Sequence, residues 1–171
     1  ASARTVAMKV VDSLLKRVQD SESGRTLKLT SVVPLPQLAA LLKALGGNKS
    51  TTRLDLEGCG IGDEGAKRLA GLLRKRTCLE ELDLQFNQIS DVGAEALAKG
   101  LAASTLRQIH IGNNNLTERG ARVLLAAVEE NQEEHGDGID LIGVQHLLDC
   151  GGDRSRGRSP ARERSVSPGR R

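Results

Sequence analysis

The chain has 171 residues, of which 38% are hydrophobic, 27% are charged and only 1% are aromatic, and its formal net charge is +3. This length fits one domain with short appendages. No apolar run approaches the roughly 18 residues that cross a bilayer, and the first residues lack the layout of a secretory signal peptide. The three cysteines have no disulfide-type spacing, which favours a reducing, intracellular setting in the cytoplasm, the nucleus or both. We therefore expect neither a membrane protein nor a disulfide-stabilised secreted scaffold.

The N-terminal segment, residues 1–20, has an amphipathic pattern. Between residues 3 and 19, apolar side chains recur at helical spacing and charged side chains fall on the other faces. We predict a helix that caps one end of the fold. The alternative is a helix that docks in the groove of a partner.

The middle of the chain, residues 21–150, repeats one short pattern. Five segments have an apolar residue, any residue and a second apolar residue, and their spacings are 27, 28, 27 and 30 residues. A period of this length is typical of stacked repeats, which bury their apolar residues against neighbouring copies. The predicted strand cores are Leu27–Leu29, Leu54–Leu56, Leu82–Leu84, Ile109–Ile111 and Ile139–Leu141.

Each central strand core is followed by a turn and a helix. The turn position is Cys59, Asn87 or Asn114, and an asparagine there can bond the backbone of the bend. Each helix has a Gly-Ala pair near its start, where we expect the glycine to allow helix and strand backbones to approach. The first unit has a proline-rich turn and a helix over 36–46, and the last keeps a strand and about one helical turn.

The segments LDLEGCGIGDEGAKRLAGLL, LDLQFNQISDVGAEALAKGL and IHIGNNNLTERGARVLLAAV resemble the ribonuclease-inhibitor-type leucine-rich repeat, which NOD-like receptors and Ran GTPase-activating protein also use. The resemblance implies an α/β solenoid with a curved parallel sheet on the concave side and helices on the convex side. It covers roughly residues 27–145 and specifies a fold more than a function.

The C-terminal segment, residues 151–171, differs sharply in composition. It has seven arginines against two acidic residues, a net charge of +5, so the preceding residues carry −2. With almost no apolar residues it is predicted to be disordered. Its Arg-Ser pairs resemble the arginine–serine-rich tails of splicing-associated proteins. Candidate phosphorylation sites are Ser155, Ser159, Ser165 and Ser167, and two phosphates would remove most of the +5 charge.

The candidate binding residues flank the strand leucines, because alternate residues of a strand face opposite sides of a sheet. We expect Asp55, Asp83 and His110 to lie near one another, with Asp140 next in the same column. The interpretations left open are a solvent-screened surface partly neutralised by Arg53 and His110, a face for a basic protein partner, and a metal or acid–base site. The candidate partner-binding set is Arg53, Asp55, Glu57, Glu81, Asp83, Gln85, Gln108, His110 and Asp140, and Lys28 heads the middle column.

Two further residues have uncommon chemistry for this chain. Phe86, the only aromatic residue, is expected to pack between turns, and the alternative is an exposed anchor for a partner. Cys150 is expected to be the most exposed thiol.

No nucleotide loop, catalytic triad or Cys–His pair is evident, so we predict a protein that is not an enzyme and needs no cofactor, metal or small-molecule substrate. The favoured function is a scaffold or adaptor that binds a protein through the concave face. One alternative is an RNA-processing accessory factor whose tail makes non-specific contact with RNA or another polyanion. The other is a fragment of a larger receptor or GTPase regulator.

Overall fold

The computed structural model describes residues 25–149 except residues 30, 76 and 137. The predicted capping helix of residues 1–20 and the predicted disorder of residues 151–171 therefore lie outside the described residues. Within them, no helix is both long enough and apolar enough to span a membrane.

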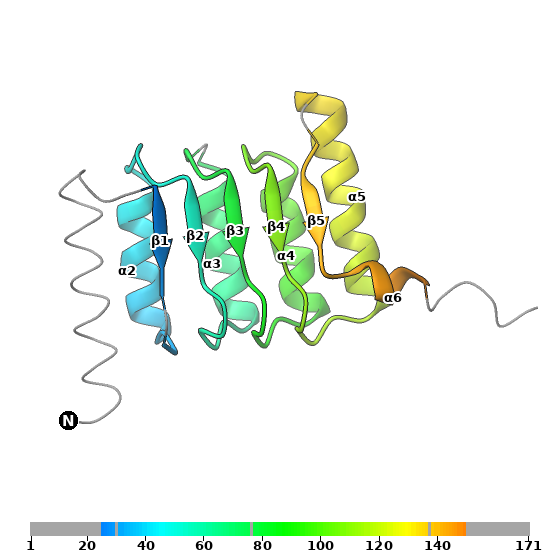
Figure 1. Cartoon of the computed structure of the whole chain (residues 1–171), viewed down its shortest axis with the longest axis horizontal. Coiled ribbons are helices and arrows are strands. Elements are labelled where there is room, and N and C mark those ends of the chain that lie inside the picture. Colours follow the sequence, from blue (N-terminus) through cyan, green and yellow to red (C-terminus); the bar gives the residue numbers. More distant parts are fainter. Residues whose placement is uncertain (1–24, 30, 76, 137, 150–171) are drawn as a thin grey trace, which may run out of the picture.

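Strands and helices alternate along the described chain, and the strands form one five-stranded sheet in sequence order (Figure 1). All four strand pairings are parallel. Each strand therefore returns to the same edge through a helix, as the alternation of apolar patterns predicted. The elements are β1 (Thr26–Lys28), α2 (Leu35–Leu45), β2 (Arg53–Asp55), α3 (Asp63–Leu73), β3 (Glu81–Asp83), α4 (Asp91–Leu101), β4 (Gln108–His110), α5 (Glu118–His135), β5 (Asp140–Ile142) and α6 (Gln145–Asp149).

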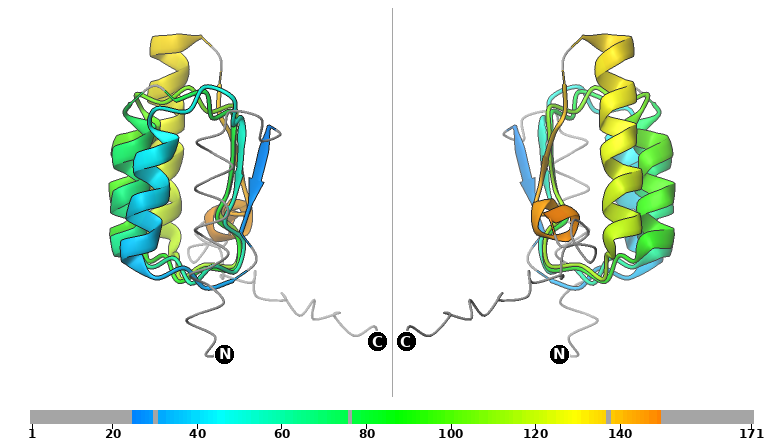
Figure 2. Two further views of the ribbon diagram at one scale, coloured as in Figure 1. Left: turned by 90° about the vertical axis from the view of Figure 1, so that its left-hand side faces the viewer. Right: turned by 90° about the vertical axis from the view of Figure 1, so that its right-hand side faces the viewer.

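The molecule has two layers, with the long helices α2 to α5 covering one face of the sheet (Figure 2). The leucines and isoleucines of the first four strand cores point toward those helices and are almost fully buried, Leu54 and Leu82 completely so, whereas Leu141 of β5 is only partly buried. This arrangement confirms the predicted leucine-rich-repeat solenoid. We call the sheet face opposite the helices the concave face.

The register confirms the predicted intervals except the last. Leu54 pairs with Leu82 and Leu82 with Ile109, but Ile109 pairs with Leu141. The last interval is thus 32 residues rather than 30. Helix α5 has 18 residues, whereas α2, α3 and α4 have 11 each, and its extra turns displace the final strand along the chain.

The turn asparagines join neighbouring repeats. Asn87 Nδ2 donates to the carbonyls of Leu56 at 2.9 Å and Leu84 at 3.0 Å, and Asn87 Oδ1 accepts from the backbone N–H of Ile61 at 2.8 Å. Asn114 makes the same bonds one repeat later. The predicted asparagine ladder is therefore present, and it satisfies backbone groups that would otherwise be buried without partners.

An aspartate at the start of α3 and another at the start of α4 also join neighbouring repeats. Asp63 accepts from the backbone N–H and hydroxyl of Ser90 and from the N–H of Gly93, at 2.7–3.0 Å. A β-carbon at Gly93 would lie 2.6 Å from Asp63 Oδ1 and 2.7 Å from Ile89 Cγ2. The glycine was expected to let the helix and strand backbones approach each other. Gly93 instead makes room for the Asp63 side chain of the preceding helix, so that prediction is wrong.

Candidate interaction surface

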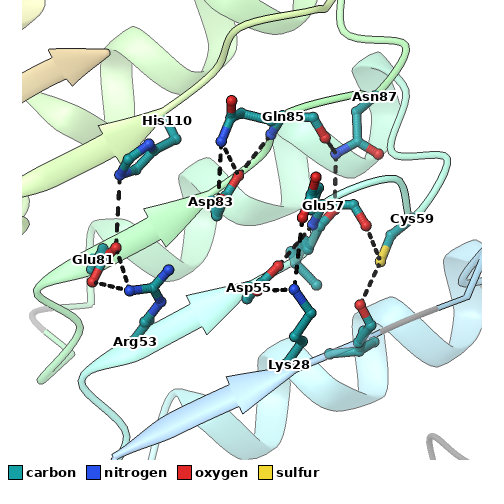
Figure 3. A network of polar contacts seen from close by, with 12 residues as sticks. Lys28, Arg53, Asp55, Glu57, Cys59, Glu81, Asp83, Gln85, Asn87 and His110 are labelled. Carbon is teal, nitrogen blue, oxygen red and sulfur yellow. Dashed lines mark hydrogen bonds and ion pairs between the residues drawn. The ribbon is translucent and has the colours of Figure 1, made fainter. Parts of the chain in front are cut away.

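Two rows of side chains leave the concave face, because residues one apart from each buried leucine point away from the helices. The strand pairings place Lys28, Asp55, Asp83 and His110 in one row. The other row, on the amino-terminal side of the buried leucines, contains Arg53, Glu81, Gln108 and Asp140. Glu57 and Gln85 extend the surface beyond the strand ends (Figure 3). The predicted residues therefore lie together on one surface.

The placement of Asp140 was predicted incorrectly. Asp140 pairs with Gln108, and Ile142 takes the place beside His110. The two-residue displacement of β5 keeps Asp140 on the concave face, since strand residues two apart share a face. Asp140 is solvent-exposed there.

Asp55 and Asp83 are held by their own turns. Each carboxylate accepts a hydrogen bond from the backbone N–H two residues later, at 3.1 Å from Glu57 and 3.0 Å from Gln85. The residues are only 4% and 6% exposed. Such bonds are typical of aspartates that stabilise a bend. These two aspartates therefore have a structural role that the alternating pattern did not reveal.

The neutralising partners also differ from the expected ones. Lys28 Nζ lies 2.7 Å from Asp55 Oδ2 and 3.6 Å from Glu57 Oε2, whereas Arg53 pairs with Glu81 at 2.8 Å. The Asp55 carboxylate raises the pKa of Lys28 through its hydrogen bond and its charge. Asp83, by contrast, accepts only from the neutral backbone and side-chain amides of Gln85 in the hydrogen bonds described.

His110 faces Glu81 without a hydrogen bond. Its Nε2 is 3.7 Å from Glu81 Oε1, and this buried nitrogen has no hydrogen-bond partner among the described residues. Glu81 is also bound by Arg53, so its carboxylate links two strands. His110 thus adjoins the Arg53–Glu81 pair rather than neutralising the aspartate row.

The concave face is acidic as a whole. Two cationic and five anionic side chains give the set Lys28, Arg53, Asp55, Glu57, Glu81, Asp83 and Asp140 a net charge of −3. Its most accessible acidic groups are Glu57, whose side chain is 43% exposed, and Asp140. Such a surface favours contact with a basic partner. It offers no metal site among the described residues, where no group of three acidic, histidine or cysteine residues could hold an ion.

Phe86 was expected to pack between turns, and this prediction is wrong. The side chain is 58% exposed, and its backbone adopts a left-handed φ of +53°. The equivalent residues of the adjacent repeats, Gly58 and Asn113, share this conformation. The position belongs to a tight turn that follows β3, so the side chain there lies outside the core and directly after Gln85 of the candidate set. Its status as the only aromatic residue was the sole sequence signal.

The described cysteines are free thiols with different environments. Cys59 is buried at a turn, and burial raises the pKa of its thiol to about 11. Cys78 is exposed and lines a hollow of about 570 Å³ at the opposite sheet edge, beside Thr105 and Asn131. Cys150 lies outside the described residues.

Comparisons with known proteins agree with this architecture. Residues 47–70 and 75–98 match the family model described as leucine-rich repeat. Over 87 residues the chain is 33% identical to NACHT, LRR and PYD domains-containing protein 12 of Mus musculus, covering 50% of this chain and 8% of that protein. Over 81 residues it is 32% identical to ribonuclease inhibitor of Sus scrofa, covering 46% and 18%. The chain thus spans less than a fifth of either relative.

A solved structure shows the same fold over a larger share of the chain. The structure of actin-binding site 2 of leiomodin-1 superimposes with a TM-score of 0.68 at 19% identity, covering 77% of this chain and 78% of that one. At this identity the likeness concerns the arrangement of strands and helices.

Proposed function

Because this chain is a leucine-rich-repeat protein, we propose that it is a non-enzymatic scaffold or adaptor whose concave face binds a partner protein. The observation that carries the proposal is the acidic concave face itself. Its polar side chains come from five neighbouring strands and share one surface, while the leucines between them form the core. The side chains that remain accessible are free to select a partner.

The residues proposed for contact separate into two groups. Asp55 and Asp83 shape the surface, because each is committed to a turn. Direct contact is assigned to the more exposed Glu57 and Asp140 and to the half-buried amides Gln85 and Gln108, with Arg53, Glu81 and His110 between them. Because the leiomodin-1 structure of the same fold is an actin-binding site, actin is a suitable first purified probe.

The test is affinity capture with charge-matched variants. Glu57→Lys with Asp140→Lys reverses two accessible charges on the concave face, and Glu64→Lys with Glu95→Lys reverses two on the helices. We expect the concave variant to capture at least tenfold less partner than the native chain, whether the partner is actin or a protein from cell extract. The helical variant should capture as much as the native chain. Equal capture by both variants would exclude the concave face. Circular dichroism confirms that each variant is folded.

We propose that the basic tail modulates this binding. Phosphorylation at Ser155, Ser159, Ser165 or Ser167 would replace much of its +5 charge with negative charge. The same charge supports the alternative function in RNA processing, although without aromatic residues the tail has no base-stacking platform. RNA retention that falls steeply with salt and disappears when residues 151–171 are deleted would favour that alternative.

A further inference from the structure

Phe86 is exposed and held in a conformation that suits other residues. Glycine and asparagine enter the left-handed region most readily, and the two adjacent repeats use Gly58 and Asn113 at this position. A phenylalanine there adopts an unfavourable backbone conformation. Burial does not compensate for it, since 58% of Phe86 is exposed. A strained, exposed aromatic residue directly after Gln85 of the concave face indicates that its side chain contacts a segment outside the described residues or another molecule.

The turn that carries Phe86 is joined through the backbone to the preceding turn, which carries Glu57. Glu57 and Gln85 occupy equivalent positions in neighbouring repeats, joined by a backbone bond from Gly58 N–H to the Gln85 carbonyl, and Phe86 follows Gln85 directly (Figure 3). Asp83 receives only neutral donors in the described hydrogen bonds. An arginine guanidinium matches both features, because its planar group stacks on an aromatic face and donates to carboxylates at the same time.

The chain itself supplies an arginine-rich segment that begins at the right edge. In a parallel sheet the carboxyl ends of all strands share one edge, so the turn carrying Phe86 after β3 and helix α6 after β5 lie along the same edge (Figure 1). Two strand spacings, about 10 Å, separate β3 from β5. The five residues from Asp149 to Arg154 can span up to about 17 Å. The later arginines can reach farther.

We propose that residues 154–171 bind in cis to the acidic concave face, with an arginine stacked on Phe86 and paired with Glu57. The C-terminal segment and the concave face have opposite net charges, +5 for residues 151–171 and −3 for the concave set. The contact would compete with a partner for the same surface, a consequence that rests on the proposed function. The contact itself requires no partner.

A tryptophan reporter tests the contact in the full chain. The chain has no tryptophan or tyrosine, so Phe86→Trp introduces a single fluorophore. In 50 mM salt, an arginine stacked on the introduced indole should shield it from acrylamide. We expect the quenching constant to rise at least twofold when salt is raised to 500 mM. The same rise is expected when Arg154, Arg156, Arg158 and Arg162 are also changed to serine. The control is Val92→Trp at the start of α4, where the native side chain is 54% exposed and on the helical layer.

Equal quenching with and without the four arginines, or an equal change at the Val92→Trp control, would overturn the proposal. Protection that grows with protein concentration would also overturn it, since the tail would then bind a second copy. A second measurement keeps Phe86: tryptic cleavage after the tail arginines should be at least threefold slower in the native chain than in the Glu57→Lys, Asp140→Lys variant. Equal cleavage rates would contradict the contact. Neither assay contains a partner, so failure here leaves the proposed partner binding to be judged by capture.

Discussion

Asn87 shows how a single side chain joins two repeats. It donates to three backbone carbonyls and accepts from one backbone N–H while only 6% exposed. Removing it leaves these groups buried without partners, and each unsatisfied group costs about 1–3 kcal/mol. We therefore expect Asn87→Ala to lower the free energy of unfolding by about 2–4 kcal/mol, since part of the cavity can admit water.

Urea denaturation followed by circular dichroism measures this loss. The matched control is Gln88→Ala in the same turn, because Gln88 is exposed. A surface change of this kind shifts the free energy of unfolding by about 0.5 kcal/mol or less. Similar values for the two variants would show that the asparagine ladder does not hold the repeats together.

The environments of Phe86, Asp55 and Asp83 depend on turn conformations that an alternating pattern does not encode. The alternating pattern predicts which face a side chain leaves, and it did so correctly for both aspartates. It does not predict that each carboxylate folds back onto the next turn. Nor does it predict the left-handed backbone that exposes Phe86, because that conformation depends on the turn shared with the neighbouring repeats.

At the scale of the elements, two helical glycines should respond oppositely to the same change. Gly93→Ala places a β-carbon 2.6 Å from Asp63 Oδ1, whereas a β-carbon at Gly71 on α3 meets nothing within 4 Å. We expect Gly93→Ala to destabilise the fold by about 1–3 kcal/mol through crowding. Gly71→Ala should stabilise it by about 0.5–1 kcal/mol, because alanine favours the helix. Thermal unfolding of both variants provides the measurement, and a stabilised Gly93→Ala variant would refute the close helix contact.

The links between helices should weaken in acid. Burial tends to raise the pKa of Asp63, but hydrogen bonds from the Ser90 hydroxyl and from the backbone of Ser90 and Gly93 outweigh it, so the pKa is lowered. A lowered pKa in the folded state stabilises the fold above the unfolded pKa, about 3.9, and this contribution is lost as the pH falls through the folded value. We therefore expect the free energy of unfolding to decrease once the pH is below about 4.

Urea titrations at pH 5, 4 and 3 test this dependence. Asp63→Asn removes the titrating group, so the variant should be less stable at pH 5 and should lose less on acidification. The Thr117 side chain and backbone likewise lower the pKa of Asp91, and the double variant should show a shallower dependence still. An unchanged slope in both variants would assign the acid sensitivity to other groups.

At the scale of the whole molecule, the sequence predicted the architecture more closely than the contacts. The leucine pattern identified all five strands, and the 27- and 28-residue intervals give the observed pairings from β1 to β4. The β5 pairing was misplaced by two residues, because Leu141 and not Ile139 pairs with Ile109. The concave set was grouped correctly, but Lys28 rather than Arg53 neutralises Asp55, since that choice depends on side-chain reach across strands.

Site-specific photo-crosslinking tests most directly whether the concave face is the binding surface. A photoreactive amino acid is placed at Gln85 or Gln108 on the concave face, or at Lys67 or Arg122 on the helices, in the full chain inside cells. We predict that the two concave positions yield a shared covalent adduct with one protein, and that the two helical positions do not. Adducts with a common protein from the helical positions alone would contradict the assignment of the concave face as the binding surface.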